Sequence, residues 1–163
     1  MNPFKQLLSA AGGHAPVGTW ISSASPLVAE AVAHAGFEWG VIDMEHSPLD
    51  LMGVLHLLQA VSSSRMVPVV RVPWNDTVTI KRLLDAGCHN FLIPFVETAE
   101  QARAAVAATR YPPQGVRGVS VSQRSNRYGA VPDYFRQVND NIAVIVQIES
   151  RAGVAAAAEI AAV

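Results

Sequence analysis

The sequence predicts an α/β fold built on a parallel sheet. Short apolar runs alternate with segments of helical periodicity along the chain, which indicates successive βα units rather than hairpins. Four of these runs end abruptly in polar or charged residues, in the segments 41–46, 69–71, 91–94 and 144–149. Half of the 163 residues are hydrophobic, so the chain can bury the core of one domain.

The expected strands are short runs rich in valine and isoleucine, each bounded by glycine, proline or polar residues. They cover residues 17–21, 39–43, 68–72, 90–93 and 142–148. Because a helix-length segment follows each run, the connections are expected to be crossovers between parallel strands.

The expected helices have recognisable ends. Ser25, Asp76 and Thr98 stand where an N-cap belongs, with Gln101 completing a capping box after Thr98, and Gly87 can end a helix in the left-handed conformation. Ser47-Pro48 is expected to open the second helix, and Gly36 to end the first. The helices are expected over residues 26–34, about 49–61, 77–85, 99–108 and 152–163.

Residues 111–139 break the alternation. This segment holds prolines, glycines, serines and the arginines Arg117, Arg124 and Arg127, with at most a short helix at 132–137. Loops of this length in compact domains are more often functional than not, so we expect the segment to carry function.

Five parallel strands fit two architectures, an open sheet and a (β/α)8 barrel of which only about the first five units are present. Length favours the open sheet, because a whole barrel typically takes about 250 residues. The ending favours the barrel, because an alanine-rich helix that finishes at Val163 without a cap or polar tail looks interrupted. The residues alone leave both open.

Composition excludes several classes of function. The net charge of −1 and the scattered basic residues give no basic stripe for a nucleic-acid partner. No apolar stretch approaches the roughly 20 residues that span a bilayer, so we expect no membrane partner and a cytoplasmic protein. Cys88 is the only cysteine, which rules out an intramolecular disulfide and a cysteine-based metal site.

Glu149 and Gln147 are candidate site residues at the end of the last expected strand. Strand alternation puts them on one face, after an almost wholly apolar run. A carboxylate in that setting must be paired, protonated or bound to a metal, and its oxygens favour hard cations such as magnesium or manganese. The alternative is that Glu149 caps the next helix or pairs with a lysine.

Three further candidates are a cation, a base and a carboxylate. Arg71 lies in an apolar strand and needs an anion, either a ligand carboxylate or enolate, or the acid of a neighbouring strand. His46 ends a strand beside carboxylates that can raise its basicity, as a general base requires. Asp85 opposes the dipole at the end of its helix and needs compensation, from His46 or from solvent.

Several motifs follow one another in register across the chain. They are Asp-Met-Glu-His-Ser-Pro at 43–48, Pro-Val-Val-Arg-Val-Pro-Trp-Asn-Asp at 68–76, Ile-Lys-Arg-Leu-Leu-Asp-Ala-Gly at 80–87, Thr-Arg-Tyr-Pro-Pro-Gln-Gly-Val-Arg-Gly at 109–118 and Val-Gln-Ile-Glu-Ser at 146–150. In these motifs the sequence resembles the HpcH/HpaI family of metal-dependent, class II pyruvate aldolases. Residues 91–98 and 118–122 resemble most the 2-dehydro-3-deoxyglucarate aldolase branch, with the 4-hydroxy-2-oxoheptanedioate branch as the alternative.

The resemblance implies reversible retro-aldol cleavage of a 2-keto-3-deoxy sugar diacid to pyruvate and tartronate semialdehyde. In the alternative branch the products would be pyruvate and succinate semialdehyde. By resemblance, Glu149 is a ligand of the divalent metal, which is magnesium or manganese, with cobalt as a further candidate. Gln147 and Arg71 bind the keto acid, and Arg71 also stabilises the enolate oxygen. A separate hypothesis is that Arg117, Arg124 and Arg127 recognise the distal carboxylate.

For proton transfer the resemblance implies a dyad. His46 is the acid-base residue, Asp85 raises its basicity, and Asp43 helps to orient it.

Residues 1–163 are expected to form one barrel-type domain that is incomplete at its C-terminus. The family's second metal-binding aspartate lies in a Gly-Pro-Ser/Ala-Asp segment beyond Val163. The resemblance implies a homo-oligomer, a hexamer, for the full-length protein. The competing interpretations are a non-catalytic truncated fragment and a related lyase that cleaves a thioester.

Overall fold

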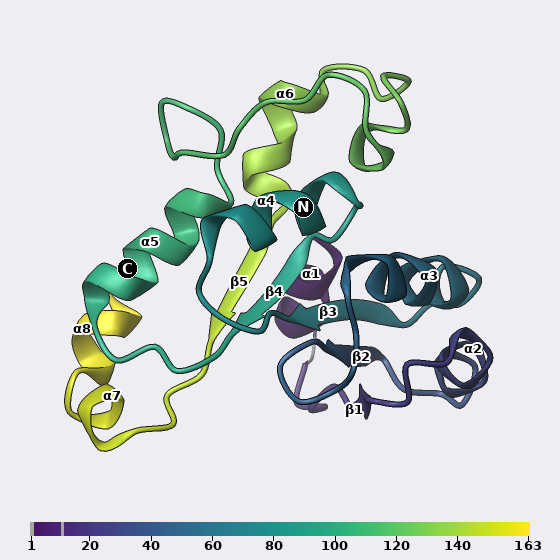
Figure 1. Cartoon of the computed structure of the whole chain (residues 1–163). Coiled ribbons are helices and arrows are strands. Elements are labelled where there is room, and N and C mark those ends of the chain that lie inside the picture. The colour runs from purple at the N-terminus through teal and green to yellow at the C-terminus, as the bar shows by residue number, and fades with distance from the viewer. Residues whose placement is uncertain (1, 11) are drawn as a thin grey trace.

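A computed structural model describes residues 2–10 and 12–163. Five parallel strands form one sheet in the order β1-β2-β3-β4-β5, so the predicted α/β fold and crossover connections are confirmed (Figure 1). The strands are β1 (Gly18–Ile21), β2 (Trp39–Asp43), β3 (Val67–Arg71), β4 (Asn90–Ile93) and β5 (Ala143–Val146). The last strand is shorter than expected, so Gln147 follows it instead of lying within it, and Glu149 lies farther along the same connection.

Eight α-helices and two 3₁₀ helices are present in the described residues. They are α1 (Pro3–Ser9), α2 (Pro26–Ala33), α3 (Leu51–Val61), α4 (Thr77–Asp85), α5 (Ala99–Ala108), η1 (Arg124–Asn126), α6 (Tyr134–Gln137), η2 (Val138–Asn141), α7 (Arg151–Ala155) and α8 (Ala157–Ala161). In this part of the chain no helix is both long enough and apolar enough to cross a membrane.

The N-caps predicted from the sequence are confirmed. The side chains of Ser25, Asp76 and Thr98 accept hydrogen bonds from the amides three residues on. The start of α3 was predicted wrongly: Asp50, not Ser47-Pro48, caps this helix, because its carboxylate accepts from the Gly53 amide at 2.8 Å. The last predicted helix is confirmed in place but not in continuity, since it divides into α7 and α8 at residue 156.

The two faces of the sheet are covered differently. Residues such as Ile42, Val70 and Phe91 point into the main core, where the sheet packs against the helices. Their neighbours Val41 and Val69 point to the other face and form a smaller cluster with Phe4 of α1. The sequence analysis did not predict α1, which covers part of this second face.

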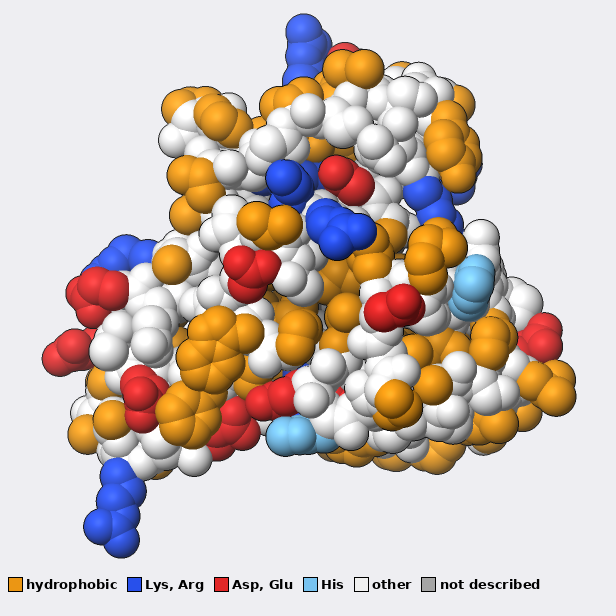
Figure 2. Space-filling view, in the orientation of Figure 1, with side chains coloured by type: hydrophobic (Ala, Val, Ile, Leu, Met, Phe, Trp, Pro, Cys, Tyr) orange, Lys and Arg blue, Asp and Glu red, His pale blue; other side chains and the backbone are white. Residues whose placement is uncertain are grey.

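The predicted excursion between α5 and β5 lies at the end of the sheet where the strands begin. In Figure 1 its green loops and α6 stand at the top, whereas α7, which follows the carboxyl end of β5, lies at the bottom. The expected short helix within it is confirmed as α6. Residues in this segment therefore lie at the opposite end of the sheet from those that follow the strands. In the same orientation, Figure 2 shows acidic and basic side chains scattered over this face of the molecule.

Candidate active site

The register of the sheet brings two charged residues together at the carboxyl edge. Asp43 ends β2 and Arg71 ends β3, and the two are direct partners in the parallel ladder. Strand alternation puts both on the face of Val41 and Val69, away from the helices. Their pairing therefore follows from the strand sequences and needs no loop to arrange it.

Arg71 is held on three sides. Its Nε donates to Asp43 Oδ1 at 2.9 Å and its Nη2 donates to Asp43 Oδ2 at 2.8 Å, a bidentate pair. Its Nη1 lies 3.1 Å from Glu45 Oε2, and its guanidinium lies 4.4 Å from the ring centroid of Trp20 on β1. The hydrogen bond with Asp43 raises the pKa of Arg71, and Glu45 and Glu149 add to the effect, so the cation is permanent.

Asp43 organises the loop that follows β2. Its Oδ1 also accepts the backbone amides of Glu45 at 3.0 Å and His46 at 3.4 Å. Burial raises the pKa of Asp43, but the hydrogen bonds from Arg71 and the two amides outweigh it, and the net shift is downward. The carboxylate therefore stays ionised and fixes the start of the loop.

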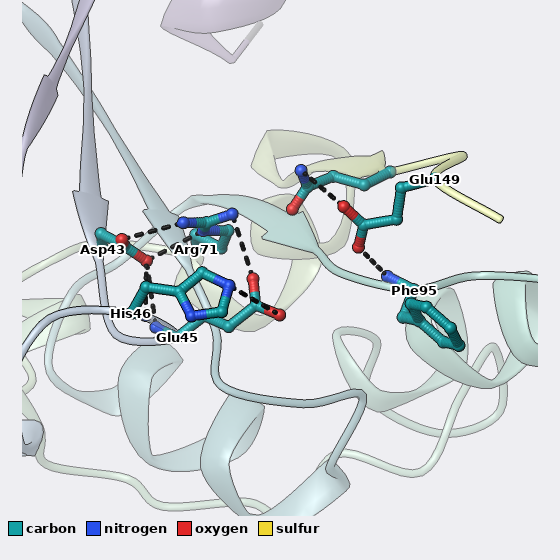
Figure 3. A network of polar contacts seen from close by, with 7 residues as sticks. Asp43, Glu45, His46, Arg71, Phe95 and Glu149 are labelled. Atoms are coloured by element: carbon teal, nitrogen blue, oxygen red, sulfur yellow. Dashed lines mark hydrogen bonds and ion pairs between the residues drawn. The ribbon is translucent and has the colours of Figure 1, made fainter.

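His46 reaches out from this loop into solvent. Its side chain is 72% exposed, and its Nε2 lies 3.7 Å from Glu45 Oε1 (Figure 3). Asp43 contacts the backbone amide of His46 and not its ring. An exposed imidazole beside a carboxylate can exchange protons with water or with a ligand placed over Arg71.

Glu149 and Gln147 form the other half of the site, just past β5. The backbone amide of Phe95 donates to Glu149 Oε1 at 2.8 Å, and Gln147 Nε2 donates to Glu149 Oε2 at 3.4 Å. Phe95 adopts a left-handed conformation with φ of 54°, which is unfavourable for a non-glycine residue and holds its amide toward the carboxylate. Figure 3 shows Glu149 across from the Asp43, His46 and Arg71 group.

The donors available to a metal are oxygens. Gln147 Oε1 is buried and has no hydrogen-bond partner among the described residues, and Glu149 supplies a half-paired carboxylate nearby. Within residues 2–10 and 12–163 no three His, Cys, Asp or Glu side chains converge on one point. A magnesium-type cation, which keeps waters and takes one or two carboxylates plus ligand oxygens, fits this donor set in kind.

Asp85 does not reach His46 in this structure, contrary to the expected dyad. It ends α4, before β4 begins, whereas His46 follows the end of β2, so the two lie at opposite ends of the parallel sheet. Asp85 Oδ1 instead accepts Arg117 Nη2 at 2.9 Å. The compensation that Asp85 needs at its helix end comes from this fully buried guanidinium.

The three arginines of the excursion also lie away from this edge. Arg117 is bound to Asp85, and Arg124 Nη1 donates to the carbonyl of Ala86 at 2.8 Å, beyond the last turn of α4. Arg127 belongs to the same loop. The structure therefore does not place Arg117 and Arg124 beside Arg71, and recognition of a distal carboxylate by these arginines stays a prediction.

Three contacts of the candidate site were missed from the sequence. Glu45 had a signal, because it stands two residues after Asp43 in the same motif. Trp20 also had a signal in the sequence. Strand alternation puts it on the same face of the sheet as Val41, its partner in the ladder. The amide of Phe95 had none, because nothing in the sequence marks its left-handed backbone.

Comparisons with known proteins agree on one family. Residues 17–163 match the family described as HpcH/HpaI aldolase/citrate lyase. A protein of Salmonella newport (strain SL254) named 5-keto-4-deoxy-D-glucarate aldolase is 55% identical over 153 residues, which are 94% of this chain and 59% of that protein. The chain thus spans 59% of the length of this curated relative.

Two solved structures share the fold. An HpcH/HpaI aldolase/citrate lyase family protein from Burkholderia cenocepacia J2315 has a TM-score of 0.93 and 41% identity, over 99% of this chain and 65% of that one. The HpcH/HpaI aldolase from Desulfitobacterium hafniense DCB-2 has a TM-score of 0.87 and 32% identity, over 98% of this chain and 61% of that one. The five βα units therefore have the barrel fold of these proteins.

Proposed function

This chain belongs to the HpcH/HpaI aldolase/citrate lyase family, and from that premise we propose that the whole protein is a divalent-metal-dependent aldolase. Its reaction would be the reversible cleavage of a 2-keto-3-deoxy sugar diacid to pyruvate and tartronate semialdehyde. The observation that carries the proposal is the arrangement at the carboxyl edge. A fixed cation, Arg71, lies across from the carboxylate of Glu149, which Gln147 contacts (Figure 3).

Arg71 would bind and polarise the keto acid. Asp43 and Glu45 contact all three nitrogens of the guanidinium, so its position is set before a ligand arrives. As the carbon–carbon bond breaks, negative charge develops on the keto oxygen, and a preorganised guanidinium stabilises it. Trp20 limits the approach of water to one side of this group.

His46 would move the proton. Cleavage requires loss of the proton from the hydroxyl on one of the two carbons joined by the breaking bond. The oxygen then forms the carbonyl of the aldehyde, and the electron pair of the broken bond leaves with the other fragment as the pyruvate enolate. His46 would take the hydroxyl proton, directly or through water, and the enolate would be protonated on carbon to give pyruvate. The high exposure of its ring leaves it free to reach a ligand lying between Arg71 and Glu149.

Glu149, with Gln147 beside it, would hold the metal. Magnesium, manganese and cobalt are the candidates, and the bound cation would act as a Lewis acid toward the keto oxygen. The backbone amide of Phe95 donates to one carboxylate oxygen of Glu149, and the side-chain amide of Gln147 donates to the other.

The curated relative supports the choice of substrate. Counted from the other end of a six-carbon diacid, a 5-keto-4-deoxy compound has the 2-keto-3-deoxy pattern, which matches the glucarate branch better than the heptanedioate alternative. Hexameric assembly and a cytoplasmic location stay predictions.

A two-substrate assay tests the proposal. The protein expressed from the complete reading frame that contains this sequence would be given 5-keto-4-deoxy-D-glucarate or 4-hydroxy-2-oxoheptanedioate, with magnesium, with manganese or with a chelator. We expect metal-dependent pyruvate release, with a higher kcat/KM for the glucarate compound. Equal release with a chelator would overturn the metal role, and a preference for heptanedioate would overturn the substrate.

A further inference from the structure

A pocket of about 340 Å³ lies at the end of the sheet opposite to the candidate active site. It is formed where the turn between α4 and β4 meets the excursion. Its lining residues are Gly87, His89, Arg124, Ser125, Arg127 and Tyr128. Two of these residues are arginines and none is a carboxylate, so the pocket carries positive charge that its own walls do not neutralise.

The cationic groups of the pocket have spare hydrogen-bonding capacity. Arg127 is exposed, and its guanidinium has no partner among the described residues. Arg124 uses Nη1 to reach the carbonyl of Ala86, which leaves its remaining N–H groups available. A guanidinium with free donors is suited to planar, bidentate recognition of an oxyanion.

The approach of Arg124 depends on Gly87. A Cβ on Gly87 would lie 2.6 Å from Arg124 Nη1, and Gly87 adopts a φ of 96°, which disfavours any other residue. On the far side of the pocket, Arg127 and Tyr128 have φ values of 50° and 56°. Two consecutive non-glycine residues in this region are costly, and such strain is often found where the backbone presents a ligand-binding group.

His89 adds a buried polar atom without a partner. Its Nδ1 is buried and makes no hydrogen bond among the described residues. Burial lowers the pKa of His89, and the two charges that act on it, Arg117 and Arg124, lower it further. No carboxylate opposes them, since the Asp85 carboxylate is already engaged by Arg117.

Capping of α4 does not account for this charge. Arg82 lies in the last turn of the helix, Arg124 donates to the carbonyl of Ala86 just beyond it, and Arg117 pairs with Asp85. Arg127 contacts neither, yet it lines the same pocket as His89 and Ser125. We propose that this pocket is a binding site for a small oxyanion of the phosphate or carboxylate class, separate from the aldolase site.

Calorimetric titration with inorganic phosphate at constant ionic strength tests the proposal. For the wild-type protein we expect saturable binding with about one site per chain. Binding should be weakened at least tenfold in the single variant Arg127→Gln, and also in the double variant that carries both Arg124→Gln and Ser125→Ala. The matched control is Arg136→Gln, which removes the same charge from an exposed position on α6 that does not line the pocket. A parallel titration with succinate distinguishes the two classes of oxyanion. The site is assigned to the phosphate class if phosphate has the lower Kd, and to the carboxylate class if succinate has the lower Kd.

Two results would overturn the proposal. One is the absence of saturable binding of either anion to the folded wild-type protein. The other is equal weakening by Arg127→Gln and Arg136→Gln, which would reduce the effect to general surface charge. Thermal melts without anion show that the variants are folded, and unchanged phosphate binding in Glu149→Gln separates this site from the proposed aldolase function.

Discussion

Arg71 is the residue on which most contacts at the carboxyl edge converge. It is bound through two nitrogens to Asp43, contacts Glu45 and stacks against Trp20. A lysine at this position would keep the charge but lose the planar fork that these contacts require. The site therefore depends on the shape of the guanidinium as well as its charge.

Arg71→Lys is expected to lower kcat for pyruvate release by about a hundredfold, the usual cost of losing one preorganised donor to a developing oxyanion. Steady-state kinetics measure it, and Arg103→Lys, which is exposed on α5, is the matched control. If Arg71→Lys raises KM alone and leaves kcat unchanged, Arg71 binds the ground state and the transition state equally and does not specifically stabilise the developing oxyanion.

Asp43→Asn is expected to destabilise the protein by about 3 kcal/mol at neutral pH, because the largely buried Arg71 guanidinium loses its bidentate carboxylate and keeps only Glu45 as an ion-pair partner. Since the pKa of Asp43 is lowered on folding, its contribution is fully present above its ordinary pKa of 3.8 and is lost as the pH falls through the folded value. Urea unfolding between pH 3 and 7 measures both effects, with the exposed Asp133→Asn as control. A difference between wild type and Asp43→Asn that does not shrink toward acid pH would contradict this account.

At the level of elements, the end of α4 illustrates how a helix terminus is fixed by a distant segment. Arg124, from η1, donates to the carbonyl of Ala86, and Gly87 makes room for it. Arg117 binds the carboxylate of Asp85, at the last residue of the helix. The excursion therefore stabilises α4 through cations placed at its C-terminus.

Gly87→Ala is expected to cost about 2 kcal/mol of unfolding free energy, the sum of a left-handed backbone and a displaced Arg124. Gly36→Ala is a matched control, because Gly36 has a φ of 97° and open space where a Cβ would be. It should cost only about 1 kcal/mol. Equal losses in the two variants, measured by urea unfolding, would show that Arg124 moves away without cost.

Sequence reasoning worked best for elements whose signals are local. Ser25, Asp76 and Thr98 could be identified as N-caps because a cap needs only its own side chain and the next three amides. The start of α3 was mistaken because Ser-Pro and Asp50 are both plausible caps, three residues apart. The small helix α1 was missed although Asn2, followed by Pro3, is a local N-cap signal. What could not be read locally is where α1 packs, because that depends on tertiary contacts of Asn2 and Phe4.

For the whole molecule, Asn2 connects the N-terminal helix α1 to the beginnings of the strands β4 and β5. Its side chain is fully buried, and its Nδ2 donates to Asn90 Oδ1 at 2.8 Å and to the carbonyl of Asn141 at 2.7 Å. Its Oδ1 also accepts the amide of Phe4 and so caps α1. One residue therefore ties α1 to the strand-beginning end of β4 and β5.

Asn2→Ala is expected to lower the free energy of unfolding by about 2 kcal/mol, because a helix cap is lost and buried acceptors are left unpaired. Asn75→Ala, which removes a single hydrogen bond to the carbonyl of Gln101, is the control and should cost about 1 kcal/mol. Thermal unfolding compares them. A loss in Asn2→Ala no larger than in the control would contradict the role assigned to Asn2.

Topology divides the candidate site residues into two groups. Asp43, His46, Arg71, Gln147 and Glu149 end or follow strands, and the structure places them at one edge. Asp85 precedes a strand, so a parallel sheet must put it at the other end, and Arg117 lies there too. The strand order makes this separation predictable in principle, whereas the partner of Asp85 depends on how a long irregular loop folds.

The most direct test of the central claim is whether the protein forms the enolate of pyruvate. Proton NMR in deuterated water would follow exchange of the pyruvate methyl group, with magnesium or manganese and with a chelator. We predict metal-dependent exchange that is abolished in Glu149→Gln and retained in Glu100→Gln, an exposed carboxylate on α5. Exchange that persists in Glu149→Gln, or that a chelator does not reduce, would contradict a metal-assisted aldolase site at this edge of the sheet.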